Sequence, residues 1–458
     1  MTKKNLLLAC YELGHQPLSL AWPLAALSAA GLNSHAYDLS IDDFPTERAK
    51  EAQFVGIAVP MHTALRLGVE AANLVRQVNP NAHICFFGHY AWLNADYLLE
   101  ILADSVIAGE YEAPLVGLIK AVNDAQDINA IVGVSTKTTR NIPHIERIEF
   151  QIPERTNLPS LDKYAHYNSN GNHELVAYVE TSRGCLHTCN HCPIVPVYQG
   201  RFFIIPKEIV LADIRQQVAE GAKHISFGDP DFLNGPNHAL KIIREMHAEY
   251  PEITFSFTTK VEHILEQKEI IKEFSTMGCS FIITACEATS EKILTRLDKG
   301  HTLPQIKEAL QLLQNLGISP QPTWMPFTPW TSLADYIEFL AWVKEQELIP
   351  FIPAVQFAVR MLVPPGSALL NHPDVENWCG KLDQENFTYR WTHADPKMDE
   401  LHQIISSIAA ENQQENPYKV FKMIETATYK IAGKQLPIWN KPLQNIPSPP
   451  KMTENWFC

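Results

Sequence analysis

Residues 181–193 read Thr-Ser-Arg-Gly-Cys-Leu-His-Thr-Cys-Asn-His-Cys-Pro and place three thiols, Cys185, Cys189 and Cys192, directly after a strand-like run. Their spacing is Cys-x3-Cys-x2-Cys. Three thiolates can hold three corners of an iron–sulfur cube, whereas a cluster that only carries electrons is normally held by four cysteines. The stretch therefore predicts a cluster with one open iron, which a small molecule can chelate.

Two other interpretations of these cysteines stay open at this point. Positions 185, 189 and 192 are also spaced like one face of a helix, although Gly184 before them and Pro193 after them favour a loop. The second alternative is a zinc site with His187 or His191 as fourth ligand, since three cysteines and one histidine are an ordinary structural zinc set.

The composition narrows the class of protein. The chain has 458 residues and a formal net charge of −14, without any block of Lys and Arg. Because phosphate neutralisation needs a basic surface, this argues against nucleic-acid binding and favours a small-molecule substrate. No apolar run is long enough for a membrane span and no basic leader is present, so we expect a cytoplasmic protein. A reducing compartment also fits the scattered cysteines at 10, 85, 279, 286, 379 and 458.

Residues 1–125 are predicted to form a flavodoxin-like Rossmann domain. Strand-like runs alternate with helical patterns, as a parallel, doubly wound sheet requires. No G-x-G-x-x-G follows the first strand, so no dinucleotide site is expected. His15, His62 and His89 each fall just past the carboxyl end of a predicted strand, where open α/β sheets bind ligands; the plainer interpretation of each is a locally satisfied loop residue. The expected strands are 5–10, 34–39, 54–60, 83–88 and 105–109, and the expected helices are 18–30, 64–78, 92–102 and 112–122.

A second α/β unit is predicted after a linker at 126–172. Alternation returns over 173–370, and we expect a partial (β/α)6 barrel with reactive residues at the carboxyl ends of its strands. Residues 371–458 are expected to form a carboxyl-terminal extension over the open edge of the barrel. The expected barrel strands are 175–181, 223–227, 254–260, 280–286, 319–325 and 351–359, and the expected helices are 207–220, 239–249, 268–277, 303–316 and 333–346.

Three predicted strand ends carry charged residues in otherwise apolar runs, namely Glu180, Lys260 and Arg360. Each costs free energy if it is buried without a partner. We therefore expect each to be paired within the barrel or directed at a polar ligand.

The cysteine spacing and its place after the first barrel strand resemble the radical S-adenosylmethionine (radical SAM) superfamily. The resemblance implies a 4Fe–4S cluster on Cys185, Cys189 and Cys192. It implies SAM on the open iron, an electron donor such as flavodoxin or ferredoxin, and reductive cleavage of SAM to a 5′-deoxyadenosyl radical. The sequence departs from the common pattern at His191, where a larger aromatic residue is frequent, and this bears on the packing of the adenine.

The same resemblance implies further SAM-binding residues. Gly228 would let the backbone approach the methionine end of SAM, and Asp229 or Asp231 would accept a hydrogen bond from its ammonium group. For either aspartate, a plain Pro-Asp turn is the alternative. Glu287, in a segment similar to the fourth-strand segment of many family members, is the other expected SAM-binding residue.

Residues 103–112 (Ala-Asp-Ser-Val-Ile-Ala-Gly-Glu-Tyr-Glu) resemble the cobalamin-binding-type domain that precedes many radical SAM barrels. Such domains often carry Asp-x-His-x-x-Gly, whose histidine ligates cobalt, and no aspartate in 1–130 is followed by histidine at the second position. One expectation is thus cobalamin at the crevice of His15, His62 and His89, with methyl transfer as the reaction. The alternative is a radical SAM enzyme without cobalamin that catalyses a rearrangement or alkyl transfer to a soft heteroatom. The non-enzyme alternative is a zinc-stabilised binding protein.

The last residues, Glu-Asn-Trp-Phe-Cys at 454–458, resemble a radical SAM subgroup whose members end in Cys-Cys-Ala-Glu-Pro or Cys-selenocysteine-Ala-Glu-Pro. We expect Cys458 to be followed by a selenocysteine codon read as stop. The resulting chalcogen pair would bind a soft metal or metalloid and take part in turnover. A frayed chain end is the plainer alternative.

Overall fold

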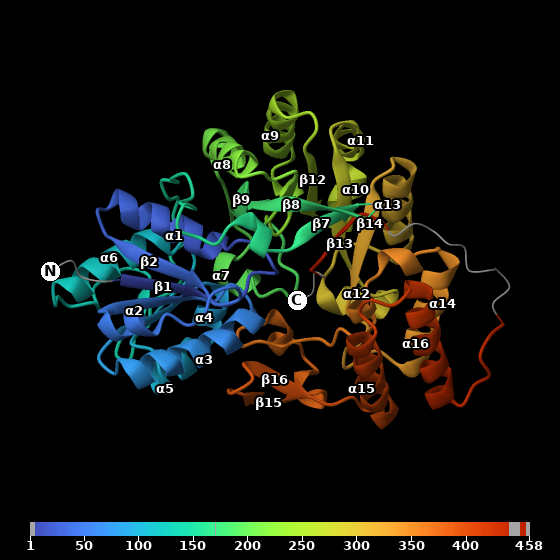
Figure 1. Ribbon diagram of the computed structural model, residues 1–458. Helices are drawn as coiled ribbons and strands as arrows, with labels where there is room; N and C mark the ends of the chain where they lie inside the picture. Colours follow the sequence, from blue (N-terminus) through green and yellow to red (C-terminus); the bar gives the residue numbers. More distant parts are fainter. Residues whose placement is uncertain (1–4, 170, 439–448, 455–458) are drawn as a thin grey trace.

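Two sheets, each built mainly from parallel strands, divide the protein (Figure 1). The computed structural model describes residues 5–169, 171–438 and 449–454. The amino-terminal sheet lies beside the barrel-forming sheet, and the carboxyl-terminal extension packs on both. The α/β class predicted from the sequence is confirmed. No helix of the described residues is long and apolar enough to span a bilayer.

The amino-terminal sheet has the strand order β2-β1-β3-β4-β5-β6, in which β1 to β5 are parallel and β6 is antiparallel. The order 2-1-3-4-5 is that of flavodoxin-like folds. β1 and β3 are buried along their whole length, because helices cover both faces of the sheet. The strands are β1 (Asn5–Ala9), β2 (Ser34–Asp38), β3 (Phe54–Ala58), β4 (His83–Phe87), β5 (Ser105–Ile107) and β6 (Val134–Thr136), and the helices are α1 (Leu18–Ala29), α2 (Thr46–Glu51), α3 (His62–Val78), α4 (His89–Leu93), α5 (Ala95–Ile101) and α6 (Glu112–Asn123).

The second sheet curls into a half-barrel with the order β14-β13-β12-β11-β8-β7-β17. Five of its strands are parallel and alternate with helices on the outer face, and β7 runs antiparallel to β8. These strands are β7 (His166–Ser169), β8 (Asn172–Val179), β11 (His224–Phe227), β12 (Thr254–Thr258), β13 (Cys279–Glu287) and β14 (Ser319–Trp324). The helices are α8 (Lys207–Ala219), α9 (Pro236–Glu249), α10 (Val261–Glu266), α11 (Lys268–Thr276), α12 (Glu291–Leu297), α13 (Leu303–Asn315) and α14 (Leu333–Glu345), with 3₁₀ turns η1 (Leu161–Lys163) and η2 (Phe232–Asn234).

The prediction of a sixth barrel strand at 351–359 is wrong. The structure has two 3₁₀ turns there, η3 (Ile349–Phe351) and η4 (Ala354–Phe357). Pro350 and Pro353 lack the N–H that a strand ladder needs, which explains the loss of pairing. A single parallel bridge between Phe327 and Arg360 remains.

The carboxyl-terminal extension covers the open side of the half-barrel. Its last described piece, residues 449–454, runs as a strap from one edge of the sheet toward the other. β17 (Lys451–Met452) pairs with β7, and the carbonyl of Pro450 accepts a hydrogen bond from Gln321 Nε2 on β14 at 2.9 Å. The strap thus spans the gap that the missing sixth strand leaves. The other elements of the extension are η5 (Ala368–Asn371), η6 (Val375–Asn377), β15 (Cys379–Asp383), β16 (Thr388–Trp391), α15 (Pro396–Glu411) and α16 (Pro417–Ala432).

Candidate active site

The three motif cysteines lie in one loop, residues 185–194, between β9 (Ser182–Gly184) and α7 (Val195–Tyr198). Gly184 opens the loop with φ +76°, and a Cβ there would lie 2.4 Å from the carbonyl oxygen of Arg201. Only glycine tolerates this close approach, which brings β9 against β10 (Phe202–Ile204). The cysteines therefore do not share a helix face, and a loop can turn all three thiols toward one centre.

The thiols of this loop are available to a metal. All cysteines of the described residues are free. Burial raises the pKa of Cys192 to about 12 and also raises that of Cys185. Such thiols stay protonated until a metal displaces the proton. The nearby Lys299 ammonium opposes this effect at Cys192 and favours the thiolate.

Both histidines of the loop contact side chains from other segments through at least one ring nitrogen. His187 Nδ1 lies 3.1 Å from Lys260 Nζ, and its Nε2 lies 3.3 Å from His263 Nε2. His191 Nε2 lies 3.2 Å from Glu287 Oε1. A zinc site with His187 as fourth ligand would have to break one of these contacts, whereas Nδ1 of His191 has no hydrogen-bond partner among the described residues. The loop by itself therefore fits a site-differentiated 4Fe–4S cluster or a zinc site of three cysteines and His191.

Glu287 is turned into the site by an irregular backbone. The pairing of β13 with β14 shifts register between Ala285 and Glu287, and Glu287 has φ +65°, a conformation that costs a non-glycine residue about 1 kcal/mol or more. Lys299 Nζ donates to Glu287 Oε1 at 3.1 Å. Burial alone would raise the pKa of Glu287, but Lys299 and His191 overcome it and hold this pKa well below its usual range. Glu287 is thus a buried carboxylate, and an unpartnered Nδ1 of His191 lies beside it.

Gly228 and Asp229 shape the start of the cysteine loop. A Cβ on Gly228 would lie 2.5 Å from the ring of Tyr178, so any side chain here would have to displace that ring. Asp229 accepts hydrogen bonds from Thr181 N at 2.9 Å and from the hydroxyls of Thr181 and Ser182 at 2.6 Å each. Both oxygens of Asp229 are therefore already used to hold the segment that leads into the cysteines. Contact of either residue with SAM stays a prediction.

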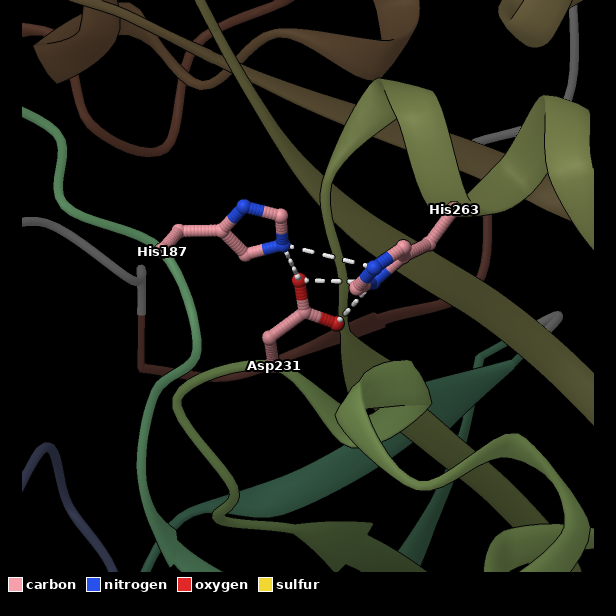
Figure 2. A group of neighbouring side chains, drawn as sticks. All are labelled: His187, Asp231 and His263. Atoms are coloured by element: carbon pink, nitrogen blue, oxygen red, sulfur yellow. Dashed lines mark hydrogen bonds and ion pairs between the residues drawn. The ribbon is translucent and has the colours of Figure 1, made fainter. Parts of the chain in front are cut away.

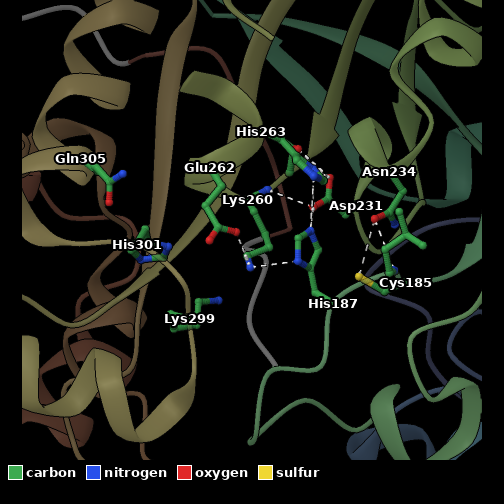
Figure 3. A network of polar contacts seen from close by, with 12 residues as sticks. Cys185, His187, Asp231, Asn234, Lys260, Glu262, His263, Lys299, His301 and Gln305 are labelled. Carbon is green, nitrogen blue, oxygen red and sulfur yellow. Dashed lines mark hydrogen bonds and ion pairs between the residues drawn. The ribbon is translucent and has the colours of Figure 1, made fainter. Parts of the chain in front are cut away.

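Asp231 belongs to a polar cluster next to the same loop. Figure 2 shows it with His187 and His263, all three pointing toward one another. His263 Nδ1 lies 3.0 Å from Asp231 Oδ1. Burial, and after it Lys260, lowers the pKa of His187, whereas Asp231 raises that of His263 against the opposing effect of burial. Figure 3 shows the wider network, in which Glu262 holds the Lys260 ammonium at 2.6 Å.

A buried ionic cluster joins the amino-terminal domain to β9, the short strand just before the cysteines. Arg183, with 7% of its side chain exposed, lies 2.9 Å from Glu110 and 2.7 Å from Glu112. Both glutamates follow β5 of the amino-terminal sheet. The Arg183 guanidinium also faces the ring of Trp22 at 4.9 Å from its centroid. Glu180, whose pKa burial raises to about 8, lies 3.4 Å from Arg183. Sequence reasoning missed this pairing, although the Gly-Glu-Tyr-Glu run after a strand was a visible signal.

The three histidines at the carboxyl edge of the Rossmann sheet point in different directions. His15 is buried and stacks on Tyr178 of the barrel, with ring centroids 4.2 Å apart. His62 Nε2 lies 2.8 Å from the carbonyl oxygen of Asn386 in the β15–β16 hairpin. His89 packs edge-on against Tyr198 of α7. Each histidine contacts a different part of the chain, so a shared role in binding cobalamin stays a prediction.

The charged strand ends are all paired within the protein. Glu180 accepts from Trp22 Nε1 at 3.0 Å, and Lys260 pairs with Glu262. Arg360 pairs with Asp399 at 2.8 Å. All three are therefore paired, but Trp22 and Asp399 belong to the amino-terminal domain and to the carboxyl-terminal extension, so pairing within the barrel is confirmed here for Lys260. Cys458 lies outside the described residues, and its role stays a prediction.

The fold and the three-thiol loop together have the arrangement expected of a radical SAM barrel behind a flavodoxin-like domain. Residues 179–340 match the family model of the radical SAM superfamily. The match supports the resemblance drawn from the cysteine motif for this part of the chain, and a 4Fe–4S cluster and SAM are what that family implies.

The relatives with known names share this core at low identity. The chain is 25% identical over 258 residues to the hopanoid C-3 methylase of Methylococcus capsulatus, covering 55% of this chain and 49% of that protein. It is 23% identical over 260 residues to the anaerobic magnesium-protoporphyrin IX monomethyl ester cyclase of a Synechocystis strain, covering 55% of this chain and 51% of that protein. The chain thus spans about half the length of these curated relatives.

Two solved structures share nearly the whole fold. One is the cobalamin-dependent S-adenosylmethionine radical enzyme OxsB with aqua-cobalamin and SAM bound, with TM-score 0.73, 16% identity, and coverage of 94% of this chain and 72% of that one. The other is the radical SAM methyltransferase TsrM from Kitasatospora setae with cobalamin and a [4Fe-4S] cluster, with TM-score 0.66, 14% identity, and coverage of 94% of this chain and 100% of that one. At these identities the likeness establishes the architecture.

Proposed function

We propose that this protein is an enzyme that cleaves SAM reductively, using a 4Fe–4S cluster on Cys185, Cys189 and Cys192, to act on a small molecule. The observation that carries the proposal is the loop of three free thiols that follows the first parallel strand of the half-barrel. The family match over residues 179–340 supports it. The reduced cluster, when bound, supplies the electron that breaks a carbon–sulfur bond of SAM.

The protein's own residues bind and orient the reactants. Glu287 is held as an anion by Lys299 and His191, so it can accept a hydrogen bond from SAM without changing its protonation state. Gly228 leaves room for the ring of Tyr178 at the end of β11, and Asp229 fixes the entry of the cysteine loop. Fixed charges of this kind need no rearrangement when the reaction occurs, which is how a preorganised site favours a charged substrate.

Replacing Glu287 with glutamine tests this site. We expect the anaerobically reconstituted wild-type protein to release 5′-deoxyadenosine and methionine after dithionite and SAM are added. In Glu287→Gln, SAM binding should weaken by about 2 kcal/mol, roughly 30-fold, the usual effect of losing a hydrogen bond to a charged group. Equilibrium dialysis with labelled SAM and chromatography of the products measure both effects. The matched control is Glu245→Gln on the outer helix α9, and equal SAM affinity in all three proteins would contradict the role of Glu287.

We propose methyl transfer with cobalamin as the leading reaction. The support is the architecture shared with two cobalamin-containing radical SAM enzymes and the alignment with a methylase. Since His15 and His62 have partners in other parts of the chain, we expect the corrin to bind without a cobalt ligand from either of them. The alternative remains a radical SAM reaction without cobalamin, a rearrangement or an alkyl transfer to a soft heteroatom.

Titration with cobalamin separates these two reactions. If methyl transfer is correct, the anaerobic protein should change the absorption spectrum of added cobalamin and retain the cofactor on a desalting column. An unchanged spectrum together with complete loss of the cofactor would remove the methyltransferase proposal. The proposal of SAM cleavage would stand, because it depends on the cysteine loop alone.

A cavity of about 740 Å³ beside the half-barrel is our candidate for the substrate chamber. Ile283 and Gln321, paired neighbours on β13 and β14, form one wall. Arg360 and residues of α15, α16 and the strap form the others. The lining mixes polar and apolar side chains, as binding sites for small organic molecules do. The fixed cation of Arg360 gives the chamber one point of polar recognition.

The remaining parts of the proposal concern partners and the chain end. We propose flavodoxin or ferredoxin as the electron donor and a reducing cellular compartment, because an exposed cluster iron does not survive oxidation.

We also propose that Cys458 takes part in turnover at the cluster site. In support, Tyr11 at the end of β1 donates to Glu454 at 2.6 Å, which holds the strap near the junction of the two sheets. DNA sequence beyond codon 458 decides whether a selenocysteine follows.

A further inference from the structure

Four side chains form an unbroken polar chain from the cysteine loop to the barrel. Lys260 Nζ lies 3.1 Å from His187 Nδ1, His187 Nε2 lies 3.3 Å from His263 Nε2, and His263 Nδ1 lies 3.0 Å from Asp231 Oδ1. Figures 2 and 3 show the rings turned toward each other along this line. The two rings lie at 53° to each other with centroids 4.9 Å apart, so they meet through their nitrogens and are not stacked.

With both imidazoles neutral, the end groups fix the direction of every proton in this chain. An ammonium group has only donors, so His187 Nδ1 must accept from Lys260. A neutral imidazole that accepts at one nitrogen carries its proton on the other, so His187 Nε2 donates to His263 Nε2. His263 then carries its proton on Nδ1 and donates to the carboxylate of Asp231. Each histidine is thereby held in one tautomer.

Asp231 is a rigid anchor for this chain. Its side chain is 1% exposed, and its carboxylate also accepts from the backbone N–H of Leu233 at 3.1 Å and from Thr259 Oγ1 at 2.6 Å. Asp231 follows β11, whereas Thr259 and Lys260 follow β12. The chain therefore ties His187, which lies between two of the motif cysteines, to the ends of two neighbouring barrel strands.

We propose that Lys260, His187, His263 and Asp231 form a directed hydrogen-bond chain that positions the cysteine loop and so retains the cluster. The inference rests on the proposed function, because it assigns these residues a role toward the cluster. His191 and Glu287 hold the other end of the same loop. Lys260, His263 and Asp231 are positioning residues that act through His187, in the way that outer partners of metal ligands fix the ligands themselves.

A metal ion on the two histidines is the competing interpretation. His187, Asp231 and His263 offer ligand atoms that all lie within 4.8 Å of one another. However, the hydrogen-bond chain uses both Nε2 atoms, and a second cation would lie close to the Lys260 ammonium. The metal interpretation thus predicts a result that the hydrogen-bond chain does not, namely a metal other than the cluster iron bound to the wild-type protein.

Replacing His263 with phenylalanine tests the proposal. The variant keeps a ring of similar size and removes both nitrogens, so His187 loses its acceptor. We expect the reconstituted variant to release iron to a chelator about 10- to 100-fold faster than the wild-type protein. The EPR signal of its reduced cluster should decay in parallel. Lys260→Met breaks the other end of the chain and should act in the same direction. His247→Phe, on the outer helix α9, is the matched control and should release iron at the wild-type rate.

The outcomes separate the possibilities. Unchanged iron release in both His263→Phe and Lys260→Met, with wild-type EPR spectra, overturns the positioning role. Additional zinc or iron in the wild-type protein that is lost in His263→Phe overturns the hydrogen-bond chain in favour of a metal site. Failure of the wild-type protein to load any cluster would contradict the proposed function itself, and it is seen before any variant is made. Melting temperatures of the variants show whether faster release comes from global unfolding.

Discussion

Replacing Arg183 with methionine should lower the free energy of unfolding by about 3–5 kcal/mol, the usual effect of removing one partner from a buried ion pair. Glu110 and Glu112 would remain buried without their cation, and the side chains of both are less than a tenth exposed. Denaturant unfolding followed by circular dichroism measures the change. Because Arg183 immediately precedes Gly184, we also expect poorer cluster loading in this variant.

The matched control is Arg244→Met, which removes an exposed cation paired with Glu273 on the outer helices. Exposed pairs contribute at most about 1 kcal/mol, so this variant should unfold near the wild-type denaturant concentration. Adding Glu110→Gln and Glu112→Gln to Arg183→Met should recover part of the loss, since no buried charge is then left unpaired. A change below that of the Arg244 control would show that the ionic cluster does not join the amino-terminal domain to β9.

Replacing Cys192 with alanine should abolish stable cluster binding and SAM cleavage. Two thiolates cannot hold the three protein-bound corners of the cube, so iron and sulfide should fall to background after reconstitution and desalting. Cys279→Ala, at the start of β13, removes a buried thiol outside the motif and should keep the full cluster. Iron and sulfide analysis with visible absorption compares the two. Normal cluster content in Cys192→Ala would contradict the assignment of the loop.

The local pattern of the sequence was sufficient for most of the fold. The strands of the Rossmann sheet are short apolar runs separated by helical periodicity, and the structure places them close to the predicted bounds. The sixth barrel strand failed because an apolar run around Pro350 and Pro353 reads as a strand, whereas proline cannot complete the ladder. The short strands β6 and β17 were missed because they are stabilised by pairing partners distant in the chain. β7 was missed although it forms a hairpin with the adjacent β8, because it lies in the stretch predicted as a linker.

In the candidate site, too, some residues could be predicted from the sequence and others could not. The cysteine motif and Glu287 could be found because their spacing and their position at a strand end carry chemical meaning. His263 could not, since a single histidine in an amphipathic helix has no pattern of its own, and only the packing of α10 brings it to His187. Likewise the pairing of Arg183 with Glu110 joins residues 73 positions apart across two sheets. Such contacts become visible only when the topology is known.

The most direct test of the central claim is the EPR spectrum of the reconstituted, dithionite-reduced protein before and after SAM is added under anaerobic conditions. The account predicts a reduced 4Fe–4S signal that changes when SAM binds, because three cysteines leave one iron open to the amino and carboxylate groups of SAM. The change should be absent from Cys192→Ala, which forms no cluster. A cluster signal that SAM does not alter, or a colourless protein that holds zinc on the three cysteines and resists iron loading, would contradict the account.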